Sequence, residues 1–204
     1  MKLTKPYHIL LLGLYLTIAE CKTPFGIKVY NIKKFMRSPH RIWTYATTAG
    51  RHCWCQADVT QFIDEAKIVY THYFLSPGEL KRHTKMKGYF PKKNLMFVQP
   101  YGSSNEVKHE IVYFDKSAKC AVIKVSSAIS SGGNMNKLDL RVWNTHNVAH
   151  SAQPCIPVFR RISRELHVVY KDMCQKLLDK GRPSQDQDVE GRKNPRDFVC
   201  LNYG

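Results

Sequence analysis

The sequence lacks the short motifs that mark several large groups of enzymes. It contains no HExxH pattern, no GxSxG pattern and no Walker-type phosphate loop, which identify many metalloproteases, serine hydrolases and nucleotide-binding enzymes. Nine histidines are present, but no cluster singles out an acid–base pair of the kind that catalysis needs. We therefore expect a protein that is not an enzyme and that needs no cofactor.

Long apolar runs, internal repeats, low-complexity tracts and N-x-S/T sequons are also missing. The apolar run Ile9–Ala19 has only 11 residues, which is too few to span a bilayer. It follows Lys2 and Lys5 and ends near the small residue Cys21, as a signal peptide does. We expect residues 1–21 to be removed, the protein to be secreted and no transmembrane segment to remain.

Acidic residues are scarce, at 16 against 32 lysines and arginines. Residues 22–57 carry seven basic residues and no acid, and six more basic residues lie between Lys81 and Lys93. Such a field attracts anions, among them heparin-like glycans, anionic membranes and acidic small molecules. The alternative is a solvated basic surface without a dedicated partner. We expect no specific nucleic-acid partner.

We interpret the cysteines as disulfide-bonded residues rather than metal ligands. Removal of residues 1–21 leaves six, an even number that in a secreted protein implies three disulfides but not their connectivity. The Cys53-Trp54-Cys55 pair has no second close pair to complete a zinc site, so we expect no metal.

Eight short segments rich in β-branched and aromatic residues are separated by turn residues, which predicts an up-and-down barrel or a sandwich. The predicted strands are 41–48, 53–62, 67–74, 80–90, 95–99, 107–114, 119–126 and 138–144. Beyond them, apolar residues recur every three or four positions and predict one amphipathic helix between Pro157 and Gly181, packed on the outside of the sheet. We therefore expect residues 22–181 to form the barrel and the helix, and residues 182–204 to form a polar tail. Cys200 is expected to attach the end of this tail to the rest of the protein.

Several stretches together resemble a known family. They are Ile42–Tyr45, Cys55–Val59, Tyr113–Asp115, Cys120–Val125, Leu138–Asn144, Cys155 and Tyr170–Cys174. In this order and spacing, over about residues 28–180, they resemble the salivary lipocalins of ticks, the group that includes the histamine-binding proteins. The resemblance implies an eight-stranded antiparallel lipocalin barrel with one outer helix, secreted in saliva. An eight-stranded barrel is wide enough to hold one small ligand.

The resemblance also implies the disulfide pairs Cys55–Cys174, Cys120–Cys155 and Cys53–Cys200. Because alternate residues of a strand point to the same side, we expect Cys53 and Cys55 to share one strand face. An exchange of their two partners therefore stays open.

The amine-binding members of that family share a motif that begins with a cysteine. An acidic residue directly follows this cysteine, and a second acidic residue further along the chain is followed two residues later by an aromatic residue. Here Ala121 replaces the first acid, Asp139 keeps the second, and Arg141 replaces the aromatic residue. An inward arginine repels an amine and favours a carboxylate or phosphate. The chemistry of this motif therefore points to an anionic ligand.

Alternation along the last strand supports a role in a cavity. Asp139, Arg141 and Trp143 share one face, and if the family register holds they point into the barrel, while Leu138, Leu140 and Val142 pack under the helix. The alternative is an Asp139–Arg141 pair that merely plugs the barrel. Further candidates for the lining, each of which could instead be simple core, are Trp43, Tyr45, Tyr70, His72, Phe74 and Phe97.

These features together predict a secreted salivary protein that sequesters a small host mediator, with an anionic lipid of the eicosanoid type favoured. One alternative is a biogenic-amine binder of the same fold. The other is a basic surface-acting protein that binds heparin, anionic membrane or a host protein while its cavity is filled.

Overall fold

The structure of the chain is a computed structural model and describes residues 28–50, 53–76, 80–128 and 134–179. The predicted signal peptide, the polar tail and Cys200 lie outside the described residues. The predictions about them, including the Cys53–Cys200 pair, stay predictions.

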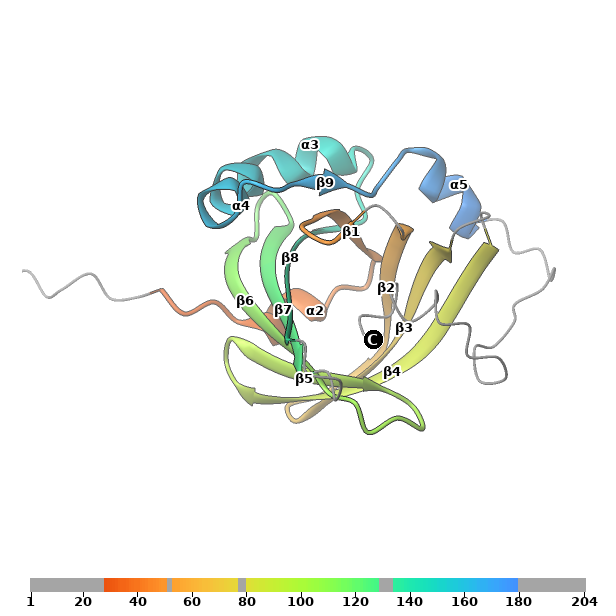
Figure 1. The fold of residues 1–204 in the computed structure, drawn as a ribbon, viewed down its shortest axis with the longest axis vertical. Helices are drawn as coiled ribbons and strands as arrows, with labels where there is room; N and C mark the ends of the chain where they lie inside the picture. Colours follow the sequence, from red (N-terminus) through yellow and green to blue (C-terminus); the bar gives the residue numbers. More distant parts are fainter. Residues whose placement is uncertain (1–27, 51–52, 77–79, 129–133, 180–204) are drawn as a thin grey trace, which may run out of the picture.

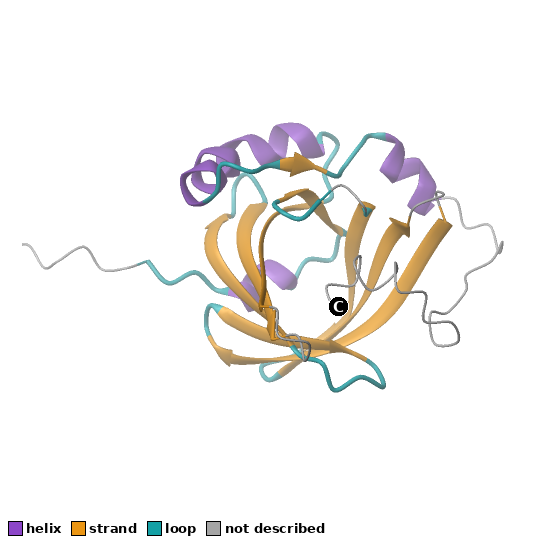
Figure 2. Cartoon of the chain, in the orientation of Figure 1, coloured by secondary structure: helices purple, strands orange, loops and turns teal. Residues whose placement is uncertain are grey.

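Eight strands form a closed antiparallel barrel, as the sequence predicts (Figures 1 and 2). They are β1 (Ile42–Thr47), β2 (Trp54–Ile63), β3 (Lys67–Ser76), β4 (Leu80–Lys92), β5 (Leu95–Pro100), β6 (Val107–Asp115), β7 (Cys120–Ala128) and β8 (Asn134–Trp143). From β2 to β8 each strand pairs with the next along the chain, and β1 closes the barrel by pairing with both β8 and β2. Strand β8 begins at Asn134, earlier than the predicted start at Leu138.

A short helix, α2 (Ile32–Met36), closes one end of the barrel (Figure 1). The Asn31 side chain caps it by accepting a hydrogen bond from the Lys34 N–H at 3.0 Å, which satisfies one of the free donors of the first turn. The Ile32 N–H donates to the Lys93 carbonyl at 3.0 Å, and the Met36 carbonyl accepts from the Thr60 hydroxyl at 3.0 Å. These bonds hold α2 between the β4–β5 turn and β2.

The helical segment packed on the outside of the barrel runs earlier in the chain than predicted. It consists of α3 (Val148–Ala152), a 3-10 turn (Gln153–Cys155) and α4 (Ile156–Ile162). The single helix predicted between Pro157 and Gly181 is wrong in its extent, because α4 ends where Ser163 adopts an extended conformation. A two-residue strand, β9 (His167–Val168), and a separate helix, α5 (Met173–Asp179), follow.

Strand β9 forms because part of the β1 backbone is not paired with β2. Strands β1 and β2 pair only at Ile42 and Trp43, so the backbone of the second half of β1 is open on that side. Strand β9 pairs with it, and the Val169 N–H donates to the Tyr45 carbonyl at 3.0 Å. Unpaired buried backbone groups are costly, and this requirement overrides the helical period of the local sequence.

The apolar side chains divide into two clusters. The inner cluster lies inside the barrel and includes Phe35, Ile68, Phe74, Met86, Met96, Val98, Ile111 and Ile123. The wall–helix cluster lies between the barrel wall and the outer helices and includes Trp43, Val122, Leu138, Leu140, Val142, Val148, Phe159 and Tyr170. Leu138, Leu140 and Val142 therefore pack beneath the helices, as the alternation along β8 predicts.

Two disulfides tie the outer helices to the barrel wall. Cys55 is bonded to Cys174 with an S–S distance of 2.06 Å, and Cys120 to Cys155 with one of 1.98 Å. These are two of the pairs that the family resemblance implies. Among the described helices, none is long and apolar enough to cross a membrane.

Cys53 and Cys55 do not share a strand face, contrary to the expectation from simple alternation. Cys53 belongs to the inner cluster and Cys55 to the wall–helix cluster. Cys55 has a φ of 52°, and the register of β2 against β3 shifts between Trp54 and Ala57. Such a bulge inserts one extra residue into the strand and so changes which face the neighbouring side chains occupy. Cys55 therefore points toward α5, whereas Cys53 belongs to the inner cluster.

Candidate ligand-binding site inside the barrel

A group of polar and charged side chains lies within the apolar interior of the barrel. This polar cluster comprises Thr47 of β1, Asp58 of β2, His72 of β3, His109 of β6, and Lys137, Asp139 and Arg141 of β8. Each is at most 8% exposed. In β3, β6 and β8 these residues alternate with outward-facing ones, so the pleat alone directs them toward the barrel axis.

Arg141 donates hydrogen bonds to both carboxylates of the polar cluster. Its Nη1 donates to Asp58 Oδ2 at 2.9 Å and its Nη2 donates to Asp139 Oδ2 at 3.0 Å. One guanidinium thus joins two strands across the barrel interior. Buried charges of this kind are tolerated only when they are paired and hydrogen-bonded.

The remaining oxygens of the two carboxylates also have partners. Asp139 Oδ1 accepts from the Thr47 hydroxyl at 2.8 Å and lies 3.3 Å from Lys137 Nζ. Asp58 Oδ1 lies 2.6 Å from His72 Nδ1. Every oxygen of the two carboxylates therefore has at least one partner within the protein.

The electrostatics follow from burial and pairing. Burial alone would raise the pKa of Asp139, but Lys137 and Arg141 lower that pKa to about 2. Burial likewise opposes ionisation of Asp58, and Arg141 with His72 brings its pKa below the usual value. Burial lowers the pKa of Arg141 and the two aspartates raise it, with a net rise. The two aspartates and Arg141 therefore carry their charges at neutral pH.

The other two basic groups of the cluster respond mainly to burial. Burial lowers the pKa of Lys137 although Asp139 opposes that change. Burial and then Arg141 hold the pKa of His109 well below its ordinary value. His109 is consequently a neutral imidazole at physiological pH. Lys137 and Arg141 face Asp139 and Asp58 in the ion pairs of the cluster.

Three nitrogen atoms of the cluster have no hydrogen-bond partner within the described part of the chain. They are Arg141 Nε, His72 Nε2 and His109 Nδ1, and all are shielded from solvent. A buried polar atom without a partner costs about 1–3 kcal/mol, so such atoms in a native protein call for an explanation. Here three of them occur in one cluster, next to the apolar side chains of the inner cluster.

The residues predicted from the sequence lie in three different places. Tyr70, His72, Phe74, Asp139 and Arg141 are in the barrel interior, as expected of lining residues. Trp143 also points inward but lies at the end closed by α2. There its Nε1 donates to the Phe35 carbonyl at 2.9 Å and its ring stacks on the Phe35 ring, with centroids 5.9 Å apart.

Three predicted lining residues do not face the interior. Trp43 and Tyr45 are on the helix side of the wall, where the Trp43 ring meets the Tyr170 ring at 5.2 Å. Phe97 is on the outer face of β5, where its ring stacks on Tyr89 at 5.5 Å. Aromatic composition identified these residues, but it carries no information on which face of a strand they occupy.

Four members of the cluster were missed, namely Thr47, Asp58, His109 and Lys137. Lys137 shares the alternation of Asp139, but the strand was predicted to begin one residue after it. His109 lies on the same strand face as Val107 and Ile111, in a segment whose alternation was recognised, so its inward position was available from the sequence. Asp58 carried a weaker signal, because the bulge in β2 breaks the alternation around it.

Comparison with protein-family models and with curated proteins gives no match. Solved structures do resemble the chain. Siderocalin Ex-FABP, described as functioning through dual ligand specificities, has a TM-score of 0.50 at 12% identity and covers 65% of this chain and 93% of its own. Lobster apocrustacyanin A1 and apocrustacyanin C2 both have a TM-score of 0.50 at 12% identity, covering 74% of this chain and 93% of theirs. At this identity the likeness concerns the fold, and the chain therefore has the lipocalin fold.

Proposed function

We propose that the protein binds a small amphipathic molecule inside the barrel, through a head group that accepts hydrogen bonds and is preferably anionic. The observation that carries the proposal is the contrast within the polar cluster. Every oxygen of its two carboxylates has a partner, whereas Arg141 Nε, His72 Nε2 and His109 Nδ1 have no partner within the described residues. Arg141 Nε carries a hydrogen in every state, so a carboxylate or carbonyl oxygen at this place satisfies that donor and removes the cost of leaving it buried and unpaired. His109 Nδ1 is a second donor in the tautomer that places the imidazole proton on this nitrogen.

The apolar part of the ligand has a matching environment. Phe74 of β3, Met86 of β4 and Val98 of β5 belong to the inner cluster and lie on the interior side of their strands. Small-molecule sites in proteins combine mostly apolar walls with a few polar groups that orient the ligand. An eicosanoid-like acid, with one carboxylate and an apolar chain, has this distribution of chemistry.

The structure changes the reason for preferring an anion over an amine. The sequence argument relied on the positive charge of Arg141, but Asp58 and Asp139 neutralise that charge. The preference instead comes from the Arg141 Nε–H donor, which has no partner among the described residues, and from the absence there of a carboxylate oxygen without a partner in the polar cluster. A biogenic amine needs a carboxylate, and to obtain Asp139 it must displace Lys137 or Arg141. This disfavours the amine alternative within the same fold.

We further propose that the protein acts as a secreted scavenger in saliva that lowers the free concentration of a host mediator, without turnover. The lipocalin fold, the predicted signal peptide and the disulfides support this proposal. Sequestration requires only tight reversible binding.

Calorimetry with arachidonate, a leukotriene, histamine and serotonin tests the proposed ligand class. We expect the two acids to bind and the two amines to bind at least about tenfold more weakly, since one charge-assisted hydrogen bond is worth about 1.5 kcal/mol or more. Tight binding of histamine with rejection of both acids would show that the ligand class is wrong.

A variant of the cluster tests the site. His109→Phe keeps an aromatic ring but removes the imidazole nitrogens, and we expect it to weaken arachidonate binding by roughly tenfold. His146→Phe is the matched control, because His146 is exposed, and it should bind arachidonate as the parent chain does. Equal affinity of both variants and the parent chain would contradict the assignment of the head group to the polar cluster.

A further inference from the structure

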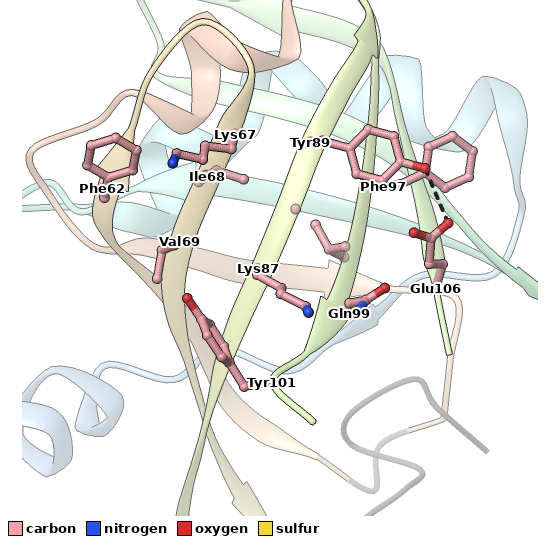
Figure 3. A pocket seen from close by; sticks show the side chains of 12 residues that line it. Phe62, Lys67, Ile68, Val69, Lys87, Tyr89, Phe97, Gln99, Tyr101 and Glu106 are labelled. Carbon is pink, nitrogen blue, oxygen red and sulfur yellow. Dashed lines mark hydrogen bonds between the residues drawn. The ribbon is translucent and has the colours of Figure 1, made fainter. Parts of the chain in front are cut away.

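The outer wall of the barrel carries a surface that the proposed ligand binding does not use. Phe62, Tyr89 and Tyr101 are 47%, 44% and 42% exposed, and all three line one depression of about 580 Å³ over β3, β4 and β5 (Figure 3). Isolated exposed apolar side chains are normal, but a contiguous group marks an interaction surface. The arrangement here is contiguous, since one depression joins the three rings.

Lysines accompany these rings. Lys67 Nζ lies 5.5 Å from the centre of the Phe62 ring, and Lys85 Nζ and Lys87 Nζ lie 5.0 and 5.8 Å from the centre of the Tyr101 ring. Figure 3 shows Lys87 between Tyr101 and the stacked pair of Tyr89 and Phe97. We call Phe62, Lys67, Lys85, Lys87, Tyr89 and Tyr101 the aromatic–lysine face.

The charge of this face is one-sided. Among the described residues that line the depression, Glu106 alone is acidic, and it accepts a hydrogen bond from the Tyr89 hydroxyl at 3.3 Å. The three lysines contact rings rather than carboxylates in the interactions given above. The whole chain adds a net charge of +16, which draws anionic surfaces toward the protein.

We propose that the aromatic–lysine face docks the protein onto an anionic phospholipid surface. Tyrosine and other aromatic rings favour the interface between water and lipid, where one part of the ring is wet and another apolar. Lysines lay their apolar stems along such a surface while the ammonium groups reach lipid phosphates, each worth about 1 kcal/mol. The face provides both groups side by side on a barrel wall that the outer helices do not cover (Figure 1).

A sulfated glycan is the competing anionic partner, and the exposed rings argue against it. A glycan sulfate satisfies the lysines but leaves Phe62 and Tyr101 largely in water. Lipid covers both kinds of group. The proposal does not depend on the ligand inside the barrel, because the polar cluster and the aromatic–lysine face are on opposite sides of the wall.

Co-sedimentation of the full chain with vesicles tests the proposal. We expect binding to phosphatidylcholine vesicles that contain phosphatidylserine, and little binding to phosphatidylcholine alone. The double variant Lys85→Gln/Lys87→Gln should bind the anionic vesicles roughly tenfold more weakly. The control Lys116→Gln/Lys124→Gln removes the same charge from β7 and the β6–β7 turn and should change binding about twofold or less, because distant charges are screened.

A second variant separates lipid from glycan without a change in charge. Phe62→Ser/Tyr101→Ser should weaken vesicle binding by roughly tenfold and leave retention on heparin unchanged. Its control is Ile162→Ser, at a side chain that is 45% exposed on α4. Equal losses for both lysine pairs, or no loss for the ring variant, would overturn the membrane proposal. Arachidonate binding by all four variants should match the parent chain, which keeps this test separate from the test of the interior site.

Discussion

Inside the barrel, Asp58 and Asp139 are both paired with Arg141, whereas on the outer face Lys85 and Lys87 both lie near the ring of Tyr101. The two arrangements differ because the first lies in the apolar interior of the barrel and the second lies in water. A buried charge must be paired, because its desolvation costs several kcal/mol. Like charges at the surface are hydrated and screened, so they can stand together without a partner. Pairing inside the barrel is thus a condition of folding, while the grouping of lysines outside is free to serve binding.

The largest expected difference between the two regions is in stability. Arg141→Met removes an ion-pair partner from each of two buried carboxylates and should lower the free energy of unfolding by about 3–5 kcal/mol. Arg164→Met, at an exposed position, should change it by about 0.5 kcal/mol or less. Urea denaturation at pH 7 measures both values. Similar small effects for the two variants would contradict the view that Arg141 holds the cluster together.

Acid should reduce the stability that the polar cluster contributes before it affects the aromatic–lysine face. The pKa of Asp139 lies at about 2 in the folded protein against 3.8 in an unperturbed side chain. The stability that this group contributes is present above about pH 4 and is lost as the pH falls through its folded pKa, a loss of about 2 kcal/mol. Unfolding of the parent chain and of Asp139→Asn, followed from pH 5 to pH 2, should show their stabilities converging. A constant difference would show that Asp139 is not held ionised by its neighbours.

A smaller effect is expected from His109 in mildly acidic solution. Its folded pKa is well below the ordinary value of 6.5, so the unfolded chain binds a proton that the folded chain excludes. Stability should therefore fall by roughly 1 kcal/mol per pH unit below about pH 6.5. The dependence should be weaker in His109→Phe and unchanged in His146→Phe. The same slope in all three proteins would mean that other groups cause it.

The smallest effect on stability should come from the aromatic–lysine face. Lys85→Gln/Lys87→Gln removes two exposed charges that have no carboxylate partner in the interactions described, and should change the free energy of unfolding by about 0.5 kcal/mol or less. Thermal unfolding in low salt measures it. A loss of several kcal/mol would show that this face is structural, and the comparison between the two regions would fail.

Much of the barrel could be predicted from the sequence, and the reasons are local. The strands alternate, and turn residues separate them, so the number of strands and the division of β8 into two faces follow from the local sequence pattern. The resemblance to the tick salivary lipocalins singled out Asp139 and Arg141 and gave the expectation that their face points inward. Trp43, Tyr45 and Phe97 were misplaced because their selection used aromatic character and not alternation within a defined strand.

The outer segment shows where local patterns stop being sufficient. Apolar residues continue at helical spacing beyond Ile162, but Leu166 and Val169 occupy an extended stretch around β9. That stretch forms because β1 parts from β2 and leaves backbone groups to be paired. Cys55 provides a second example, since its positive φ and the bulge beside it reverse the face that alternation assigns.

The sequence by itself determined the strand periods, the basic surface and the shared face of Asp139 and Arg141 in β8, because each depends on neighbours within a few residues. Only the tertiary structure decided that Asp58 and His109 join Arg141, and that Phe62, Tyr89 and Tyr101 share one outer face. These groupings depend on the register between strands that are distant in sequence, and that register is set by closure of the whole barrel.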